Sequence, residues 1–433
     1  FSPPVDWPVS ARLCQNREVR AYREILTLPG AWQFSAAGLL ARSGGAMMGL
    51  GMVLMVSSLY GSYGLAGALA ASNAVAWALG TATLSNLVDR YGQRRVMYPA
   101  VIVSASALAL LVVFAMLQLP AWTLFPPAIV SGATGGAPGA LVRARWNHAT
   151  DDPDRLHTAY ALESTLDELT FVIGPVLATA LSTGVHPAAG LIAPVVLALV
   201  GAHLLYSQHS TEPPVLPRTY QGAGRPPLRS RLVLLMPGVA AVVAVNMLIG
   251  CVFGAIDVSV VAAASEREMR ASSGVVLALF SLASGLAGFY YGSRSWGSPL
   301  VARFLWGVSA MCAACLTLLL ADSVLMLCLV GLVVGLTVAP TLINGNSLIG
   351  RLVARERLTE GLAWMGTGIG IGVAIGSSLS GQVIDVAGYH GGFVTVAGFA
   401  ALAAIIARAG ARGLGHALAR SSIDADEPEV AAS

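Results

Sequence analysis

The chain alternates between long apolar segments and short polar segments over almost its whole length. Each apolar segment has about 20 or more residues, which is the length that an α-helix needs to cross a bilayer. The pattern predicts an all-α membrane protein with twelve transmembrane helices. The predicted spans are 31–58, 63–86, 97–118, 121–142, 158–183, 187–207, 232–262, 272–291, 300–320, 323–349, 360–384 and 391–408.

The arginines predict the orientation of these spans. All 25 basic residues are arginine, because the sequence contains no lysine. If the N-terminus is cytoplasmic, 22 of them fall on cytoplasmic segments, Arg267 and Arg270 fall outside, and Arg42 lies within a span. Positive residues concentrate on the cytoplasmic side of membrane proteins. The distribution therefore predicts that both termini are cytoplasmic and that the chain is a multi-pass protein of the plasma membrane, the inner one in bacteria.

The composition agrees with this class and excludes others. Hydrophobic residues make up 56% of the chain and charged residues only 11%, against about a quarter in soluble proteins. The arginines form no patch with interleaved aromatic residues, so nucleic acid is not an expected partner. Cys312 and Cys315 form a CxxC inside an apolar span without a second pair, which indicates packing residues and no metal site. The first 30 residues lack the apolar core of a cleaved signal peptide.

A polar, proline-rich stretch divides the predicted spans into two sets of six. The divisions are an N-terminal cytoplasmic segment 1–30, a six-helix bundle 31–207, a linker 208–230, a second six-helix bundle 231–408 and a cytoplasmic tail 409–433. The two sets echo each other at an offset of about 200 residues. Two parallel six-span repeats are typical of secondary transporters whose substrate site lies between the halves.

The loop between the second and third predicted spans holds a short motif, SNLVDRYGQRR at residues 85–95. It resembles motif A of the major facilitator superfamily, usually written GxLaDrxGrr, although Ser85 replaces the opening glycine and Gln93 replaces a basic residue. The matching positions are Asp89, Arg90, Gly92, Arg94 and Arg95. The resemblance in architecture extends over nearly the whole chain.

The resemblance implies a role for this motif in gating. Gly92 permits a tight turn, and Asp89 would accept hydrogen bonds from the positive N-terminus of span 11, near Thr359, and so latch the cytoplasmic side shut. The alternative is that Asp89 and Arg90 are solvated loop charges.

A second likeness lies in span 5. Gly174 and Pro175 are similar to the Gly-Pro core of motif C, which is associated with antiporters, although the trailing glycine pair of that motif is missing. The family's arginine motif in span 4 is not matched, since Arg143 and Arg145 lie at the cytoplasmic end of that span. The resemblance implies a bacterial exporter of the drug-efflux kind.

Several ionisable residues are predicted to lie inside the bilayer, where each costs about 2.5–3.5 kcal/mol. Span 5 contains Glu163, nearer the inner interface, and Asp167 and Glu168, both ~14 Å into the helix. Span 1 contains Arg42 at a similar depth. We expect Arg42 to pair with Asp167 or Glu168, which leaves the other carboxyl protonated as a proton-coupling site. The alternative is a static network that holds the N-terminal half together.

The facilitator architecture implies that spans 1, 4, 7 and 10 line a central cavity. Span 4 is rich in glycine and proline, which should kink or unwind it. Met48, Met52 and Met55 form a stripe on span 1 that is either a substrate wall or ordinary packing. The remaining cavity candidates are Asn246, Asp257, Asn344 and Asn346, with Asp257 open to an interfacial or structural role.

Together these features predict a secondary active transporter that works by alternating access. The leading interpretation is proton-coupled export of hydrophobic or drug-like molecules by a monomer without a cofactor. The alternatives are uptake of a small nutrient, or a receptor or scaffold that retains the fold without flux. No catalytic constellation suggests an enzyme, and no GxxxxGK[ST] motif suggests direct use of ATP.

Overall fold

The computed structural model describes residues 22–215, 234, 236, 238–294, 296–353 and 358–426. Most of the predicted N-terminal segment and linker, and the end of the predicted tail, lie outside these residues. Within them the protein is all-α, as predicted, and no strand occurs. The helices of the N-terminal half are α2 (Ala31–Tyr60), α3 (Tyr63–Tyr91), α4 (Gln93–Met116), α5 (Phe125–Gly135), α6 (Pro138–Ala149), α7 (Pro153–Gly184) and α8 (Ala189–Tyr206).

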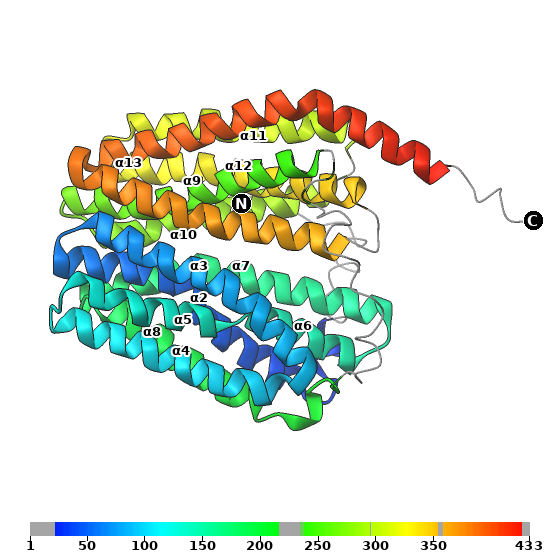
Figure 1. Cartoon of the computed structure of the whole chain (residues 1–433), viewed down its shortest axis with the longest axis horizontal. Helices are drawn as coiled ribbons and strands as arrows, with labels where there is room; N and C mark the ends of the chain where they lie inside the picture. Colours follow the sequence, from blue (N-terminus) through cyan, green and yellow to red (C-terminus); the bar gives the residue numbers. More distant parts are fainter. Residues whose placement is uncertain are drawn as a thin grey trace, which may run out of the picture.

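The C-terminal half repeats this kind of bundle. Its helices are α9 (Val239–Glu266), α10 (Ser272–Gly292), α11 (Leu300–Thr317), α12 (Val324–Leu352) and α13 (Leu358–Asp426). Short 3-10 turns, η1 (Ala121–Leu124), η2 (His209–Thr211) and η5 (Leu318–Leu320), lie between helices. The two bundles lie one above the other in Figure 1, with α2 to α8 below and α9 to α13 above.

Ten helices in the described part of the chain are long and apolar enough to cross a membrane, two fewer than the twelve predicted spans. The difference has two sources. The predicted fourth span is divided between α5 and α6, which are short helices of 11 and 12 residues. The predicted eleventh and twelfth spans both lie in α13, which is interrupted by the non-helical residue Gly388 (φ 66°, ψ −172°). Figure 1 shows α13 reversing direction, so that its two arms run antiparallel.

Several predicted boundaries differ from those in the structure. α9 begins seven residues later than the predicted start at 232 and continues to Glu266 beyond the predicted end at 262. α6 continues past residue 142 to Ala149 and carries Arg143 and Arg145 with it. The second arm of α13 continues from the predicted end at 408 to Asp426, so much of the predicted tail is helical.

The break between α5 and α6 confirms the kink that glycine and proline predict in this segment. Gly136 adopts φ 67°, a conformation that glycine takes without strain. Its carbonyl accepts a hydrogen bond of 2.7 Å from Trp77 Nε1 of α3, so the interrupted helix leaves this carbonyl satisfied. Pro138 then begins α6, which suits a residue without an N–H group.

Among the described residues, the two halves touch on one side of the molecule. We define the linker side as the side with the turn at Gly92 and residues 207–215, and the opposite side as the side with the turn at Gly61 and residues 267–271. On the opposite side, a Cβ on Gly67 of α3 would overlap the carbonyl oxygen of Ser377 in α13. A Cβ on Gly274 of α10 would lie 2.7 Å from the carbonyl oxygen of Pro175 in α7. Both helix pairs therefore meet backbone to backbone here.

Both helix pairs, α3 with α13 and α7 with α10, move apart towards the linker side. Along α13, a Cβ on Gly370 would lie 3.8 Å from Ala78 of α3, and one on Gly366 would meet nothing within 4 Å. Along α10, a Cβ on Gly285 would lie 3.2 Å from Glu168 of α7, and one on Gly292 would meet nothing within 4 Å. No hydrogen bond or ion pair between described residues joins the halves on the linker side. The structure is therefore closed on the opposite side and open on the linker side.

Candidate functional site

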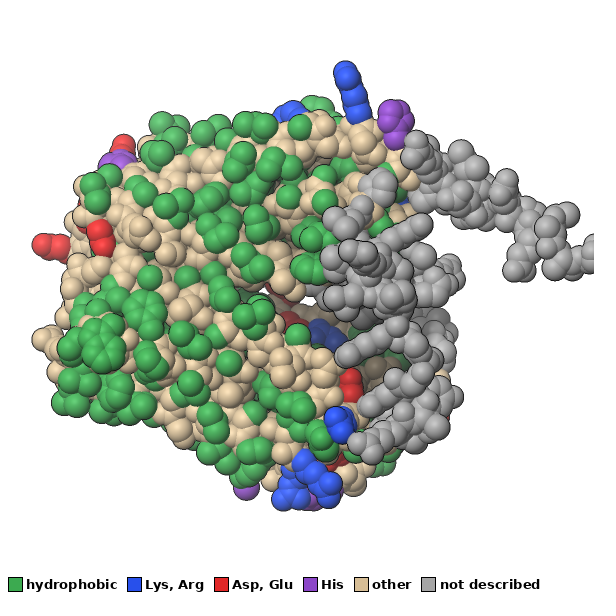
Figure 2. Space-filling view, viewed as in Figure 1, with side chains coloured by type: hydrophobic (Ala, Val, Ile, Leu, Met, Phe, Trp, Pro, Cys, Tyr) green, Lys and Arg blue, Asp and Glu red, His purple; other side chains and the backbone are tan. Residues whose placement is uncertain are grey.

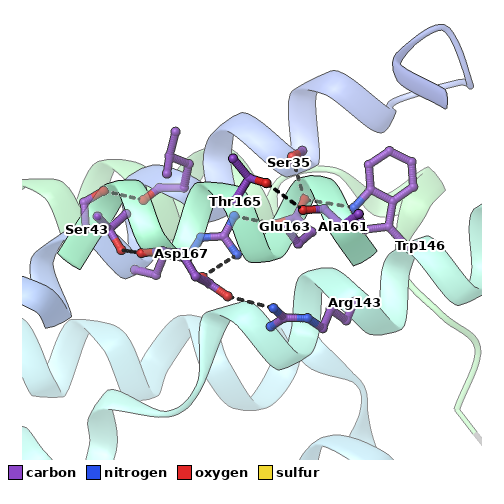
Figure 3. Close-up of polar contacts among 11 residues, drawn as sticks. Ser35, Ser43, Arg143, Trp146, Ala161, Glu163, Thr165 and Asp167 are labelled. Atoms are coloured by element: carbon purple, nitrogen blue, oxygen red, sulfur yellow. Dashed lines mark hydrogen bonds and ion pairs between the residues drawn. The ribbon is translucent and has the colours of Figure 1, made fainter. Parts of the chain in front are cut away.

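A cluster of charged side chains lies between α2, α6 and α7. Its centre is Glu163, which is fully buried. Glu163 Oε1 accepts hydrogen bonds from Ser35 Oγ at 2.6 Å and from Trp146 Nε1 at 2.9 Å (Figure 3). Glu163 Oε2 accepts a hydrogen bond from Arg42 Nη2, which completes an ion pair. Since three donors surround the carboxylate, its burial is compensated.

Asp167, one turn further along α7, lies between two arginines. Its Oδ1 is 3.1 Å from Arg42 Nη1, and its Oδ2 accepts a hydrogen bond of 2.7 Å from Arg143 Nη2 (Figure 3). The side chain of Arg42 is 8% exposed, whereas those of Asp167 and Arg143 are 30% and 33% exposed. Asp167 and Arg143 thus form the solvent-accessible end of the cluster, and Glu163 forms its buried end.

The predicted pairing was right in one part and wrong in others. The ion pair between Arg42 and Asp167 is present. Glu168 is not the second partner, because it lies about 100° round the helix from Asp167 and against Gly285 of α10. Glu163 is fully buried, and Glu163 and Asp167 together pair with two arginines, so the expected shortage of positive charge within this cluster does not arise.

The break before α6 places Arg143 in the cluster. A Cβ on Gly139, in the first turn of α6, would lie 3.3 Å from Arg143 Nη1, 3.6 Å from Arg42 Nη1 and 3.9 Å from Asp167 Oδ1. The glycine therefore lets the helix pass close beneath the three charged groups. The sequence analysis missed Arg143 and Trp146 as members. The signal available was their position four and seven residues after Gly139, close to the acids of span 5 in the expected bundle.

Arg145 of α6 has a different, structural environment. It is fully buried, and it donates to Gln93 Oε1 at 2.9 Å, to the carbonyl of Gln208 at 3.1 Å and to Thr211 Oγ1 at 2.6 Å. These contacts join α6 to the start of α4 and to the first residues of the linker. Arg145 therefore fixes the linker side of the N-terminal half.

The exposed end of the cluster borders a cleft between the halves. Gly45 and Gly49 follow Arg42 by three and seven residues on the same helix face, and a Cβ at either would meet nothing within 4 Å. Figure 2 shows the surface hollowed between the two halves, with charged side chains visible inside the hollow. The described wall of this cleft thus combines a glycine face of α2 with the Asp167 and Arg143 pair.

Several cavity candidates lie elsewhere in this conformation. Met52 and Met55 are fully buried in the hydrophobic core, and only Met48 of the three is partly exposed, so the methionine stripe packs and does not line the cleft. Asn246 is buried and donates to the carbonyl of Met365 at 3.3 Å. Asn344 is buried and accepts a hydrogen bond of 3.0 Å from Tyr291.

Asn346 and Asp257 remain as candidates. Asn346 is exposed. Asp257 is half-buried and has no hydrogen bond or ion pair among the described residues. It lies about nine residues, or ~14 Å, before the end of α9 at Glu266, because α9 continues past the predicted end at 262.

The motif A loop does not form the expected latch in this conformation. Asp89 is exposed and has no hydrogen bond or ion pair with any described residue, and the start of α13, its expected partner, is described from Leu358. Gly92 makes the predicted turn with φ 90°. The backbone N–H of Arg94 donates to Glu212 Oε1 at 3.0 Å, and Arg94 Nη1 lies 2.6 Å from His209 Nε2. The start of the linker therefore holds the basic end of the motif.

The remaining motif residues make simple contacts. The guanidinium of Arg90 lies 5.1 Å from the ring centre of Tyr91. Arg95 is exposed beside the motif A turn. Gly174 packs against Ala46 of α2, and the carbonyl of Pro175 faces Gly274 across the halves. The Gly-Pro core of motif C thus lies where α7 meets both its own half and the other.

Comparison with known proteins identifies the fold. The model of the Major Facilitator Superfamily matches residues 34–305 and 270–413, which together cover most of the chain. The chain belongs to the major facilitator superfamily. It is therefore a multi-pass membrane transporter and not an enzyme. A search among curated protein sequences finds no match.

Solved structures of several other transporters share this fold. The nucleoside transporter NupG superposes with a TM-score of 0.67 at 14% identity, over 88% of this chain and 98% of that one. The POT family transporter PepTSo gives 0.69 at 10% identity, over 90% and 99%. A bacterial homologue of the human lysosomal transporter Spinster, in an inward-facing and unoccupied conformation, gives 0.64 at 15% identity, over 89% and 97%. At such identities the likeness concerns the fold.

Proposed function

We propose that this facilitator is a proton-coupled exporter of lipophilic, drug-like small molecules that works by alternating access. The observation that carries the proposal is Asp167, a partly exposed carboxylate held between Arg42 and Arg143 at the edge of a cleft that is open on one side only. A carboxylate in this position can exchange a proton with the cleft, and its charge decides where two arginines lie.

The two acids of the cluster suit different tasks. Glu163 is fully buried and has three donors, so its role is to hold α2, α6 and α7 together. Asp167 has one fixed arginine and one partly exposed arginine. When a proton neutralises Asp167, the attraction to Arg143 weakens and that arginine can leave the pair. When Arg143 returns, it favours release of the proton. This exchange would couple proton entry to the movement of the halves.

The walls of the cleft favour a lipophilic substrate. Gly45 and Gly49 leave open space next to the charged cluster without adding a polar group. Next to the cluster, the carboxylate of Glu168 is exposed and has no ion-pair partner among the described residues. A substrate with a large apolar body and a positive group would fit an open glycine face beside an unpaired carboxylate.

We also propose the topology that such a cycle requires. α5 and α6 would together cross the bilayer once, and the two arms of α13 would cross it separately, which gives twelve crossings. The linker side would be cytoplasmic, with both termini there, because 22 of the 25 arginines lie on that side of the predicted topology. The open cleft would then face the cytoplasm of a monomer in the plasma membrane, the inner one in a bacterium.

The test is the pH gradient across inverted membrane vesicles, followed with a pH-sensitive dye while lipophilic cations such as tetraphenylphosphonium are added. We expect substrates to dissipate the gradient through the wild-type protein and not through Asp167→Asn. Binding of the same cation to purified Asp167→Asn should persist, because the substrate's apolar wall is unchanged.

Asp151→Asn is the matched control, since it removes an exposed acid on the linker side and should transport normally. Gradient loss that is equal in Asp167→Asn and wild type would overturn proton coupling at this residue. No response to any lipophilic compound, together with uptake of nucleosides or peptides, would favour the nutrient alternative. Absence of both, in folded and inserted protein, would favour a receptor or scaffold.

A further inference from the structure

A charged contact between the two halves lies on the opposite side of the molecule, at the start of α3. Asp385, near the end of the first arm of α13, accepts hydrogen bonds from the backbone N–H groups of Tyr63 at 2.7 Å and Gly64 at 2.8 Å. It also accepts a hydrogen bond of 2.7 Å from Ser62 Oγ. A side chain of the C-terminal half thus caps a helix of the N-terminal half.

This cap completes the start of α3. The first N–H groups of a helix have no partner within the helix, and together they carry partial positive charge. Ser62 Oγ accepts the N–H of Leu65 at 3.0 Å, and its carbonyl accepts the N–H of Ala66. Tyr63 and Gly64 depend on Asp385. When the halves separate on this side, these two groups and the carboxylate must all be hydrated again.

Small residues make the approach of the two helices possible. A Cβ on Gly64 would lie 2.7 Å from Asp385 Oδ2, and a Cβ on Gly381 would overlap the carbonyl oxygen of Tyr63. With Gly67 against Ser377, these glycines bring the backbones into contact directly beside the cap. The carboxylate therefore reaches the helix end only because α3 and α13 touch there.

α3 and α13 carry an acid at each end of their antiparallel pair. Asp385 ends the first arm of α13 and faces the N-terminus of α3, while Asp89 ends α3 on the linker side, where the first arm of α13 begins. In this structure the Asp385 contact is made, and Asp89 is exposed without a partner among the described residues. The acid at one end of the helix pair thus contacts the other half, whereas the acid at the other end does not.

We propose that Asp385 is a latch that holds the opposite side closed when the linker side is open, in reciprocity with Asp89 at the other end of the same helix pair. Breaking the Asp385 contact shifts the protein towards the conformation that is open on the opposite side. Breaking the Asp89 contact shifts the protein towards the conformation that is open on the linker side. The proposal rests on alternating access, one part of the proposed function, and is independent of the substrate and of proton coupling.

The test measures the opening of the opposite side by double electron–electron resonance in nanodiscs. Nitroxide labels are placed at Trp122 and Leu325, exposed residues near the ends of η1 in one half and α12 in the other, after the native cysteines are replaced. In Asp385→Ala, we expect the ratio of long to short distances to rise about threefold to tenfold, the effect of losing a charged helix cap. Gly67→Ala should act in the same direction by separating the backbones.

Glu266→Ala is the matched control. Glu266 Oε1 accepts the N–H of Tyr389 at 3.0 Å, so it also caps a helix start on the opposite side, but within the C-terminal half. It should leave the distance ratio unchanged, and Asp89→Ala should lower it or leave it unchanged. The proposal is overturned if Asp385→Ala and Gly67→Ala both match wild type, or if Glu266→Ala changes the ratio as much as Asp385→Ala does. Transport activity is not the readout, so this result stands apart from the test of proton-coupled export.

Discussion

In the N-terminal half, α2, α6 and α7 meet around charged side chains, whereas in the C-terminal half α9 and α13 meet along glycines. All ion pairs between described residues lie in the N-terminal half. In the C-terminal half, a Cβ on Gly372 would overlap the carbonyl oxygen of Met247, and one on Gly376 would overlap that of Cys251. One half therefore holds groups that can change charge, and the other offers a closely packed, largely uncharged partner.

The loops at corresponding positions differ in the same way. The loop after α3 carries the charged motif A. At the corresponding place in the second half, Trp296 of the loop after α10 stacks on Tyr291 in the last turn of α10, with ring centres 4.7 Å apart, and donates to the carbonyl of Tyr291 at 3.0 Å. The two halves thus share an architecture, although the charged motif stands in the N-terminal half and aromatic residues stand at the corresponding place in the C-terminal half.

The largest effect that would test this comparison is removal of Arg42. Arg42→Ala leaves the fully buried Glu163 without its cation, which typically destabilises by about 3–5 kcal/mol. We expect the free energy of unfolding to fall by that amount in SDS titration in bicelles. The control Arg155→Ala breaks an exposed pair with Asp152 and should change it by less than about 1 kcal/mol. Equal effects of the two variants would mean that the cluster contributes little to the N-terminal half.

The corresponding test in the C-terminal half enlarges a glycine. Gly372→Ala places a methyl group against the backbone of α9, and such overpacking costs about 1–3 kcal/mol. The same unfolding measurement should show this loss. Gly49→Ala, at an open position in α2, should be neutral or stabilising by up to about 1 kcal/mol. If Gly372→Ala is as well tolerated as Gly49→Ala, close packing does not hold α9 and α13 together.

The smallest expected effect concerns a neutral polar contact in the C-terminal half. Tyr291→Phe removes the hydrogen bond to Asn344 and should lower the free energy of unfolding by about 1 kcal/mol. Tyr290→Phe, at an exposed neighbour, should have no measurable effect. A loss in Tyr291→Phe as large as that in Arg42→Ala would show that the polar contacts of the two halves are equally important, against the contrast drawn above.

The sequence predicted the helices more accurately than the contacts between them. The apolar segments predicted most helices to within a few residues, because a helix that crosses a bilayer must be long and apolar. The break in the fourth span followed from its glycines and prolines. The structure places Gly372 and Gly376 of α13 in close contact with α9 within one half, and spacing along the chain does not identify that partner helix.

The partners of the charged residues could not be predicted in the same way. Helical spacing showed that Glu163 and Asp167 share a face, but not which neighbouring helix that face meets. Arg42 pairs with Glu163 and not with Glu168 because of the rotation of α7. Arg143 joins the cluster because of the break that redirects α6. The glycines and prolines predict the break, but no local pattern encodes the rotation of α7 or the direction that α6 takes after the break.

By itself, the sequence determined that this chain lies in a membrane, that it consists of two similar halves and that its buried charges are concentrated in the first of them. These properties follow from composition and order along the chain, which the bilayer constrains directly. Only the tertiary structure decided which acid is fully buried, which carboxylate borders the cleft, and that Asp385 contacts the other half on one side while Asp89 stays exposed on the other. Those outcomes depend on contacts between residues as much as 323 positions apart, and helix rotation and crossing set such contacts.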